Sequence, residues 1–154
     1  MDDFSSWQSP LVVALKKSGE VRICVDLRQL NRAVQRQPNP FPSFEDLSTK
    51  FCGAKRFSIL DIKDAFHQIA LAKQYRHYTT LATMKGVYRY TRIPFGLASA
   101  PVLFQRVMRY VLRGLRGILI YLDNIVVFGI DQEAHDSKLF AVLHRLEEYC
   151  IRRT

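Results

Sequence analysis

The sequence has few cysteines and no long apolar run, and each shortage excludes a class of protein. Its three cysteines are an odd number without CxxC or His/Cys ligand spacing, so they predict neither a disulfide framework nor a structural zinc site. The longest apolar stretch, residues 117–130, contains Asp123 and Asn124 and is shorter than the roughly 20 residues that cross a bilayer. Residues 1–9 carry no secretory signal. We therefore expect an intracellular chain with reduced thiols and no membrane span.

Acidic residues are missing from the middle of the chain. None occurs between Asp64 and Asp123, so this window carries nearly all of the formal net charge of +9. Four of its arginines lie on one face of a helix predicted over residues 99–115, at spacings of three, four and three: Arg106, Arg109, Arg113 and Arg116. Such a basic face is typical of a protein that binds a polyanion, above all a nucleic acid. A solvated face with no ligand is the alternative.

The hydropathy pattern mixes short strands and helices, which predicts an α+β fold with helices over one antiparallel sheet. A chain of 154 residues with 48% hydrophobic content suits one packed domain. Residues 37–42 contain three prolines and are expected to be a linker or an extended crossing. The predicted strands are 12–15, 21–25, 56–62, 68–71, 79–84, 87–92, 117–122 and 125–129. The predicted helices are 27–34, 43–51, 99–115 and one that Asp131 caps.

Two aspartates each follow an apolar strand, where a carboxylate is disfavoured. Asp61 comes after residues 57–60, and Asp123 comes after residues 119–122. If the two strands are neighbours, the carboxylates converge, and a divalent cation offsets their repulsion. Mg²⁺ binds few carboxylates and keeps its other positions for water and phosphate oxygens, as phosphoryl transfer requires. The alternative is that each aspartate is an ordinary turn residue.

Four segments in a fixed order are the most specific signal in the sequence. Residues 9–31 include Ser-Pro-Leu-Val-Val and Arg-Ile-Cys-Val-Asp-Leu-Arg-Gln-Leu-Asn, and residues 60–69 read Leu-Asp-Ile-Lys-Asp-Ala-Phe-His-Gln-Ile. Residues 90–105 include Pro-Phe-Gly-Leu-Ala-Ser-Ala-Pro, and residues 121–124 read Tyr-Leu-Asp-Asn. Together they resemble the reverse transcriptases of gypsy-type LTR retrotransposons. In order, they are similar to that family's fingers segment, first catalytic motif, template and nucleotide motif, and Tyr-x-Asp-Asp signature.

The resemblance implies a polymerase palm, an antiparallel sheet with helices packed on one face, together with part of the fingers subdomain. The partial fingers would occupy about residues 7–50, and the palm, with some fingers residues, about 51–154. Residues 1–154 would then be a single fragment of a reverse transcriptase domain. The thumb, RNase H and integrase domains of such elements would lie outside it.

The activity that the resemblance implies is that of an RNA-directed DNA polymerase, which adds dNTPs to a primer 3′-hydroxyl by a two-metal mechanism. Two Mg²⁺ ions, or Mn²⁺ in their place, would bind Asp61, Asp123 and the backbone carbonyl of Ile62. The expected partners are an RNA or DNA template with its primer, dNTPs and the remainder of a Pol polyprotein, and no membrane.

The resemblance also implies which residues hold the substrates. Phe66 would exclude the 2′-hydroxyl of a ribonucleotide, with an ordinary core aromatic as the alternative, and the lysines could equally form a solvated turn. The nucleotide-binding set is Lys16, Lys17, Arg22, Phe66, Phe95 and Gly96. The template- and primer-binding set is Gln105, Arg109, Arg113 and Tyr121.

The sequence departs from the family at Asn124, which stands where the signature has its second aspartate. An amide retains an oxygen acceptor but carries no charge, so three site carboxylates become two, and metal binding and catalysis are expected to weaken. A second hypothesis follows, in which the chain is a catalytically dead derivative of a retroelement that binds only nucleic acid or a protein. A decayed reading frame without a physiological role is the third.

Overall fold

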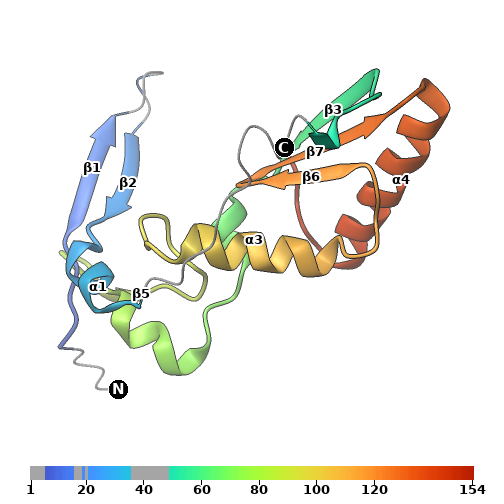
Figure 1. Ribbon diagram of the computed structural model, residues 1–154. Coiled ribbons are helices and arrows are strands. Elements are labelled where there is room, and N and C mark those ends of the chain that lie inside the picture. Colours follow the sequence, from blue (N-terminus) through green and yellow to red (C-terminus); the bar gives the residue numbers. More distant parts are fainter. Residues whose placement is uncertain (1–5, 16–18, 20, 36–48) are drawn as a thin grey trace. The chain divides into compact units, whose positions relative to one another are not determined.

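The computed structural model describes residues 6–15, 19, 21–35 and 49–154 (Figure 1). The chain divides into two compact units, each assembled from two stretches of sequence. The first unit is Met1–Gln37 with Phe66–Ala100, and the second unit is Pro38–Ala65 with Pro101–Thr154. The predicted proline-rich linker and most of the helix predicted over residues 43–51 lie outside the described residues.

The first unit contains two β-hairpins and a short helix. β1 (Leu11–Leu15) pairs antiparallel with β2 (Val21–Val25), and β4 (Thr80–Thr83) pairs antiparallel with β5 (Gly86–Arg89). Helix α1 (Arg28–Ala33) follows β2. The two hairpins and α1 confirm predicted elements, although β4 and β5 are shorter than the predicted strands.

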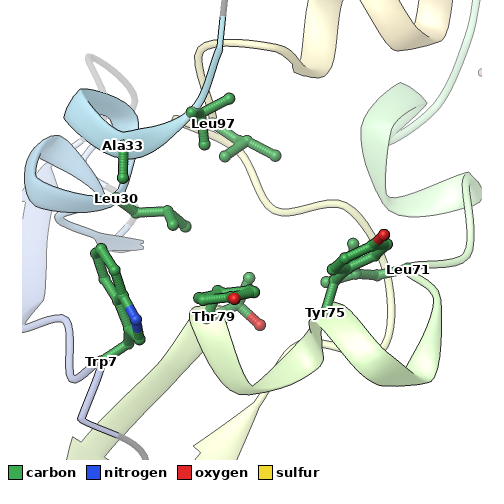
Figure 2. A pocket seen from close by; sticks show the side chains of 9 residues that line it. Trp7, Leu30, Ala33, Leu71, Tyr75, Thr79 and Leu97 are labelled. Carbon is green, nitrogen blue, oxygen red and sulfur yellow. The ribbon is translucent and has the colours of Figure 1, made fainter.

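Apolar side chains from β2, α1 and β4 form the core of the first unit. Val25, Leu27, Leu30 and Leu81 are buried there. Beside this core lies an apolar cavity of about 370 Å³, shown in Figure 2, and none of the predicted site residues lines it. Its walls are Trp7, Leu30, Ala33, Val34, Leu71, Tyr75, Tyr78, Thr79 and Leu97.

The strand predicted over residues 68–71 is wrong. The described chain forms two 3₁₀ helices around it, η1 (Ala65–Gln68) and η2 (Lys73–Thr79). A single bridge, between Ala70 and Arg92, is the β-pairing of that segment. The Thr79 hydroxyl donates to the carbonyl oxygen of Arg76 at 2.8 Å, so a side chain satisfies a carbonyl at the end of η2. A hydrogen bond between a side chain and a nearby carbonyl does not depend on the pattern of apolar and polar residues, so that pattern does not predict it.

The described residues of the second unit include a three-stranded antiparallel sheet and the helices α3 and α4. The strand order is β3 (Arg56–Asp61), β7 (Asn124–Gly129) and β6 (Ile118–Tyr121). Helix α4 (Gln132–Glu148) packs against β7 and β3 (Figure 1). Ile125 and Val127 are buried, whereas Phe57 and Ile59 on the other face are 50% and 70% exposed. The described strands thus form three sheets, not the single sheet predicted.

Helix α3 (Ala100–Val111) has a buried face and an exposed basic face, but it carries only two of the four arginines predicted for that face. Phe104 and Met108 are buried, and Arg106 and Arg109 are exposed on the helix. Arg113 and Arg116 are exposed as well, but they lie beyond the end of the helix. The helix ends at Val111 and not at residue 115, because Gly114 adopts a left-handed φ of 81°. Arg145 of α4 donates to the carbonyl oxygens of Val111 at 3.0 Å and Arg113 at 3.3 Å, which satisfies acceptors at the end of α3.

Both ends of α4 are capped. The Asp131 carboxylate accepts from the Ala134 N–H at 2.8 Å, which confirms the predicted cap. At the other end the N–H of Ile151 donates to the Leu146 carbonyl at 2.8 Å while Cys150 adopts a φ of 53°, the arrangement of a Schellman motif. The chain therefore turns back toward the sheet after α4. No helix in the described part of the chain is long and apolar enough to cross a membrane.

Cys150→Gly is expected to raise the free energy of unfolding by about 0.5–1 kcal/mol, because glycine adopts the left-handed region without the steric cost that a Cβ brings. Cys150 is exposed, so the change removes no core packing. Urea unfolding of parent and variant measures the difference. Cys150→Ser retains the Cβ and is the control, and a glycine variant no more stable than the serine variant would contradict the prediction.

Candidate active site

Strand pairing brings the two predicted carboxylate positions to one end of the sheet. Asp61 is the last residue of β3, and its register partner is Asn124, the first residue of β7. The N–H of Ile62 donates to the carbonyl oxygen of Asp123 at 2.9 Å. Both aspartates are exposed, and Asn124 is half-buried. Residues more than sixty positions apart in sequence are thus backbone neighbours at this end of the sheet. We call the end that carries Asp61, Asp123 and Asn124 the carboxylate edge.

The turn between β6 and β7 differs from the prediction by one residue. Leu122 and Asp123 form the turn, not Asp123 and Asn124, because Asn124 already pairs with Tyr121 of β6. Leu122 has a φ of 54°, the left-handed region that costs an L residue about 1–2 kcal/mol. The pairing of β7 on both of its sides holds this conformation in place. Asn124 is therefore a strand residue, and Asp123 projects from a strained turn.

The donor set at this edge fits a magnesium ion. Within the described residues, no three His, Cys, Asp or Glu side chains gather as a metal-binding group. Mg²⁺ binds through one or two carboxylates and completes its octahedral shell with water and substrate phosphates, so Asp61 and Asp123 meet its needs. Asn124 adds an amide oxygen without charge. Zinc is disfavoured, because its structural sites take four protein ligands rich in Cys and His.

Thr154 is a neighbour of Asp61 that the sequence analysis missed. Its hydroxyl donates to Asp61 Oδ2 at 3.0 Å, and its backbone N–H donates to the Asp61 carbonyl oxygen at 3.0 Å. The two residues are 93 positions apart, and no spacing rule connects them.

The predicted template and primer residues of the second unit differ in accessibility. Gln105 is only 2% exposed, and its amide donates to the Ile120 carbonyl at 2.9 Å, so it supports β6 from α3. Tyr121 is 41% exposed beside Asn124 in the sheet register. Arg109 is exposed on α3, and Arg113 is exposed in the turn that follows it. Direct contact of each with a template or primer stays a prediction.

Three of the predicted nucleotide residues lie together in the first unit. The rings of Phe66 and Phe95 meet edge to face at 5.2 Å, and the His67 ring contacts Phe95 at 4.7 Å. Both phenylalanines are half-buried. Contact of Phe66 with a nucleotide stays a prediction. Gly96 follows with a φ of 88°. A side chain there would be strained, which is the reason for glycine at this position.

The remaining predicted nucleotide residues are described in part or not at all. Lys16 and Lys17 lie outside the described residues. Arg22 is described by its backbone, which pairs with Ala14 in the β1–β2 hairpin.

Asn31 is a second residue that the sequence analysis missed, although it closes the first quoted motif. Its side-chain amide donates to the Gly96 carbonyl at 2.8 Å, and its carbonyl accepts from the Ala98 N–H at 2.7 Å. An asparagine offers both a donor and an acceptor, so one side chain can satisfy both backbone groups. Asn31 thereby fixes the Gly96 loop to α1.

An ion pair lies between β2 and α1. Arg28 donates Nε to Asp26 Oδ1 at 2.9 Å and Nη2 to Oδ2 at 2.6 Å. These hydrogen bonds hold the pKa of Asp26 below its usual value and raise the pKa of Arg28. Both residues line a polar hollow, together with Gln8, Ser9, Pro10, Gln29 and Arg32.

Comparison with known proteins identifies the family of the chain. The family described as "Reverse transcriptase (RNA-dependent DNA polymerase)" matches residues 14–152. The chain belongs to the reverse transcriptase family. It is 34% identical to the retrovirus-related Pol polyprotein from transposon 412 of Drosophila melanogaster, over 96% of this chain and 13% of that protein. The Pol polyprotein from transposon gypsy of the same species is 33% identical, over 90% of this chain and 14% of that protein.

Solved reverse transcriptase structures share the fold. A foamy viral protease-reverse transcriptase in complex with double-stranded DNA aligns with a TM-score of 0.88 at 22% identity, over 100% of this chain and 27% of that chain. The prototype foamy virus CSH mutant aligns with a TM-score of 0.87 at 20% identity, over 97% of this chain and 20% of that chain. The predicted α+β polymerase fold and the predicted likeness to gypsy-type reverse transcriptases are confirmed.

Asn31→Ala is expected to lower the free energy of unfolding of this reverse transcriptase chain by about 1–3 kcal/mol, because the Gly96 carbonyl and the Ala98 N–H both lose their partner. Urea unfolding followed by the fluorescence of Trp7, which lies in the same unit, measures the loss. Asn31→Asp retains the acceptor for the Ala98 N–H but places a carboxylate oxygen against the Gly96 carbonyl oxygen, so it is expected to be less stable than the parent as well. Equal stability of parent and alanine variant would show that water replaces the amide at no cost.

Proposed function

We propose that this reverse transcriptase chain carries the catalytic edge of an RNA-directed DNA polymerase, which adds dNTPs to a primer 3′-hydroxyl on an RNA or DNA template. The observation that carries the proposal is the pairing of β3 with β7, which makes Asp61 and Asp123 backbone neighbours. The relatives are much longer Pol polyproteins, so the remaining domains of such a protein are proposed as partners of this chain.

Asp61, Asp123 and the backbone carbonyl of Ile62 are the groups proposed to hold two Mg²⁺ ions, or Mn²⁺ in their place. When bound, the ions would promote ionisation of the primer hydroxyl and offset the charge of the triphosphate. The chain's own contribution is to hold one acidic side chain at the end of β3 and the other on a two-residue turn, and not on a long loop, which limits their reorganisation.

The incoming nucleotide is proposed to contact Phe66, Phe95 and Gly96, with Arg22, Lys16 and Lys17 on its phosphates. The edge-to-face packing of Phe66 on Phe95 supports this assignment, because a ring held by its neighbour can exclude a 2′-hydroxyl by its position. Guanidinium and ammonium groups suit the triphosphate through charge-assisted hydrogen bonds.

Template and primer are proposed to contact Arg109, Arg113, Tyr121 and Gln105, although the burial of Gln105 favours a supporting role for its side chain. A related foamy viral enzyme has been solved with double-stranded DNA, which is the kind of ligand proposed here. Arg109 on α3 and Arg113 in the turn after it supply positive charge, and no acidic residue lies near them in the sequence.

A second candidate function is nucleic-acid binding without polymerisation. Asn124 favours it, because this uncharged residue lies opposite Asp61 in the sheet, where the family signature carries its second aspartate. Two carboxylates, not three, then offset the positive charge of two divalent ions. Loss of one electrostatic contact in a transition state typically costs about 10²–10³ in rate.

Asn124→Asp is expected to raise primer extension by at least about tenfold, because it restores a negative charge at the metal-binding edge. Single-turnover extension with Mg²⁺, dNTPs and saturating primer-template measures the rate. Duplex affinity should change little, since the carboxylate acts on the metals and not on the nucleic-acid backbone.

Asp61→Asn supplies the background rate for this comparison, because it removes a proposed metal ligand without changing side-chain size. Extension by the parent at the rate of the Asn124→Asp variant, well above this background, would show that the third carboxylate is dispensable. If the Asn124→Asp variant extends primers and adding Asp61→Asn to it leaves that rate unchanged, the proposed polymerase site itself is contradicted.

Replacing Arg109 and Arg113 with glutamine is expected to flatten the salt dependence of duplex binding, by up to about one unit of slope per lost phosphate contact. The measurement is the logarithm of the binding constant against the logarithm of salt concentration. Lys73→Gln with Lys85→Gln removes the same charge from the first unit and is the control. An unchanged slope in the arginine variant would identify α3 as a solvated basic face.

A further inference from the structure

The segment after α4 runs along the start of the catalytic motif. The Lys63 N–H donates to the Arg152 carbonyl at 3.2 Å, and the Thr154 N–H donates to the Asp61 carbonyl at 3.0 Å. Ile62 and Arg153 face each other between these two bonds as an antiparallel bridge. Residues 152–154 therefore lie beside the end of β3, close to the C mark in Figure 1.

This backbone pairing places a hydroxyl on the Asp61 carboxylate. The Thr154 Oγ1 donates to Asp61 Oδ2 at 3.0 Å. The main-chain bond between the same two residues fixes the base of the threonine, and its β-branched side chain has few χ1 states, so the hydroxyl is held in position. The donor is neutral, which leaves the negative charge of Asp61 in place.

We propose that Thr154 is a positioning residue for Asp61, whose hydroxyl holds the carboxylate in the orientation that binds a divalent cation. The proposal rests on the proposed metal-binding function of Asp61. An exposed carboxylate rotates about χ2 over a broad range, and a donor on one oxygen limits that rotation. A carboxylate has about four lone-pair sites, so Oδ1 and a second site on Oδ2 stay available for a cation.

The energetic reason is preorganisation of a ligand by its outer-shell partner. Hydrogen bonds to metal-ligating side chains orient them, and their loss typically costs about 10–100-fold in metal affinity or activity. The bond matters more in this chain than in one with three carboxylates, because Asn124 leaves Asp61 and Asp123 as the charged ligands. A purely structural role would be served by the backbone bond alone, which a side-chain substitution leaves in place.

Thr154→Val is the informative variant, because valine has the shape of threonine and the same backbone N–H but no hydroxyl. Thr154 is exposed, so the change disturbs no core. Thr154→Ser retains the donor, and Thr91→Val removes an exposed threonine hydroxyl from the first unit as the matched control. Thermal unfolding verifies that each variant folds as the parent does.

Titration of the whole chain with Mn²⁺, with free Mn²⁺ followed by its EPR signal, measures the affinity without any need for catalysis. We expect Thr154→Val to weaken Mn²⁺ binding by about tenfold, as lost outer-shell partners do, and Thr154→Ser and Thr91→Val to stay within about threefold of the parent. Weakening by valine together with rescue by serine would support the positioning role.

Asp61→Asn separates failure of this inference from failure of the proposed function. If Asp61→Asn loses Mn²⁺ affinity while Thr154→Val binds as the parent does, the positioning role of Thr154 is overturned and the metal site stands. If Asp61→Asn binds Mn²⁺ as tightly as the parent, the proposed metal site fails, and the role of Thr154 fails with it.

Discussion

The antiparallel pairing of β3 with β7 is the interaction on which the candidate active site depends. It runs in unbroken register from Arg56 opposite Gly129 to Asp61 opposite Asn124. Because side chains alternate across a sheet, a slip of one residue would turn Asp61 to the helix-covered face and bring an apolar side chain to the edge. The buried positions Ile125 and Val127 oppose such a slip, since it would expose them. Core packing thus determines where the carboxylates lie.

Helix α4 contacts both α3 and the paired strands β3 and β7 of the second unit. Its Arg145 satisfies carbonyls at the end of α3, and its own C-terminal turn at Cys150 sends the chain back along β3 to Asp61. The packing of α4 and the environment of the Asp61 carboxylate are therefore linked through residues 150–154. In the first unit, Asn31 has a comparable role, because it joins α1 to the loop of Gly96.

The charge of the site shapes its chemistry as much as its geometry does. The fold of this reverse transcriptase chain brings Asp61 and Asp123 to one sheet edge, and it also places Asn124 in the register opposite Asp61. An aspartate would fit the same backbone position, because it has the size of asparagine. The fold is therefore compatible with an active and with an impaired site, and the difference between them is one negative charge in a region of few acidic residues.

Local patterns in the sequence determined the elements and the family. The apolar alternation of β3 and β7, the arginine face of α3 and the Asp131 cap are all properties of neighbouring residues, and four ordered motifs identified a reverse transcriptase. Contacts between distant residues required the tertiary structure. The Ala98 N–H bond to Asn31 spans 67 positions, and the Thr154 bond to Asp61 spans 93. The turn at Leu122 and the irregular segment between η1 and η2, where a strand was predicted, belong with them. Each of these features depends on which backbone groups meet after folding, and the spacing of residues along the sequence does not predict such contacts.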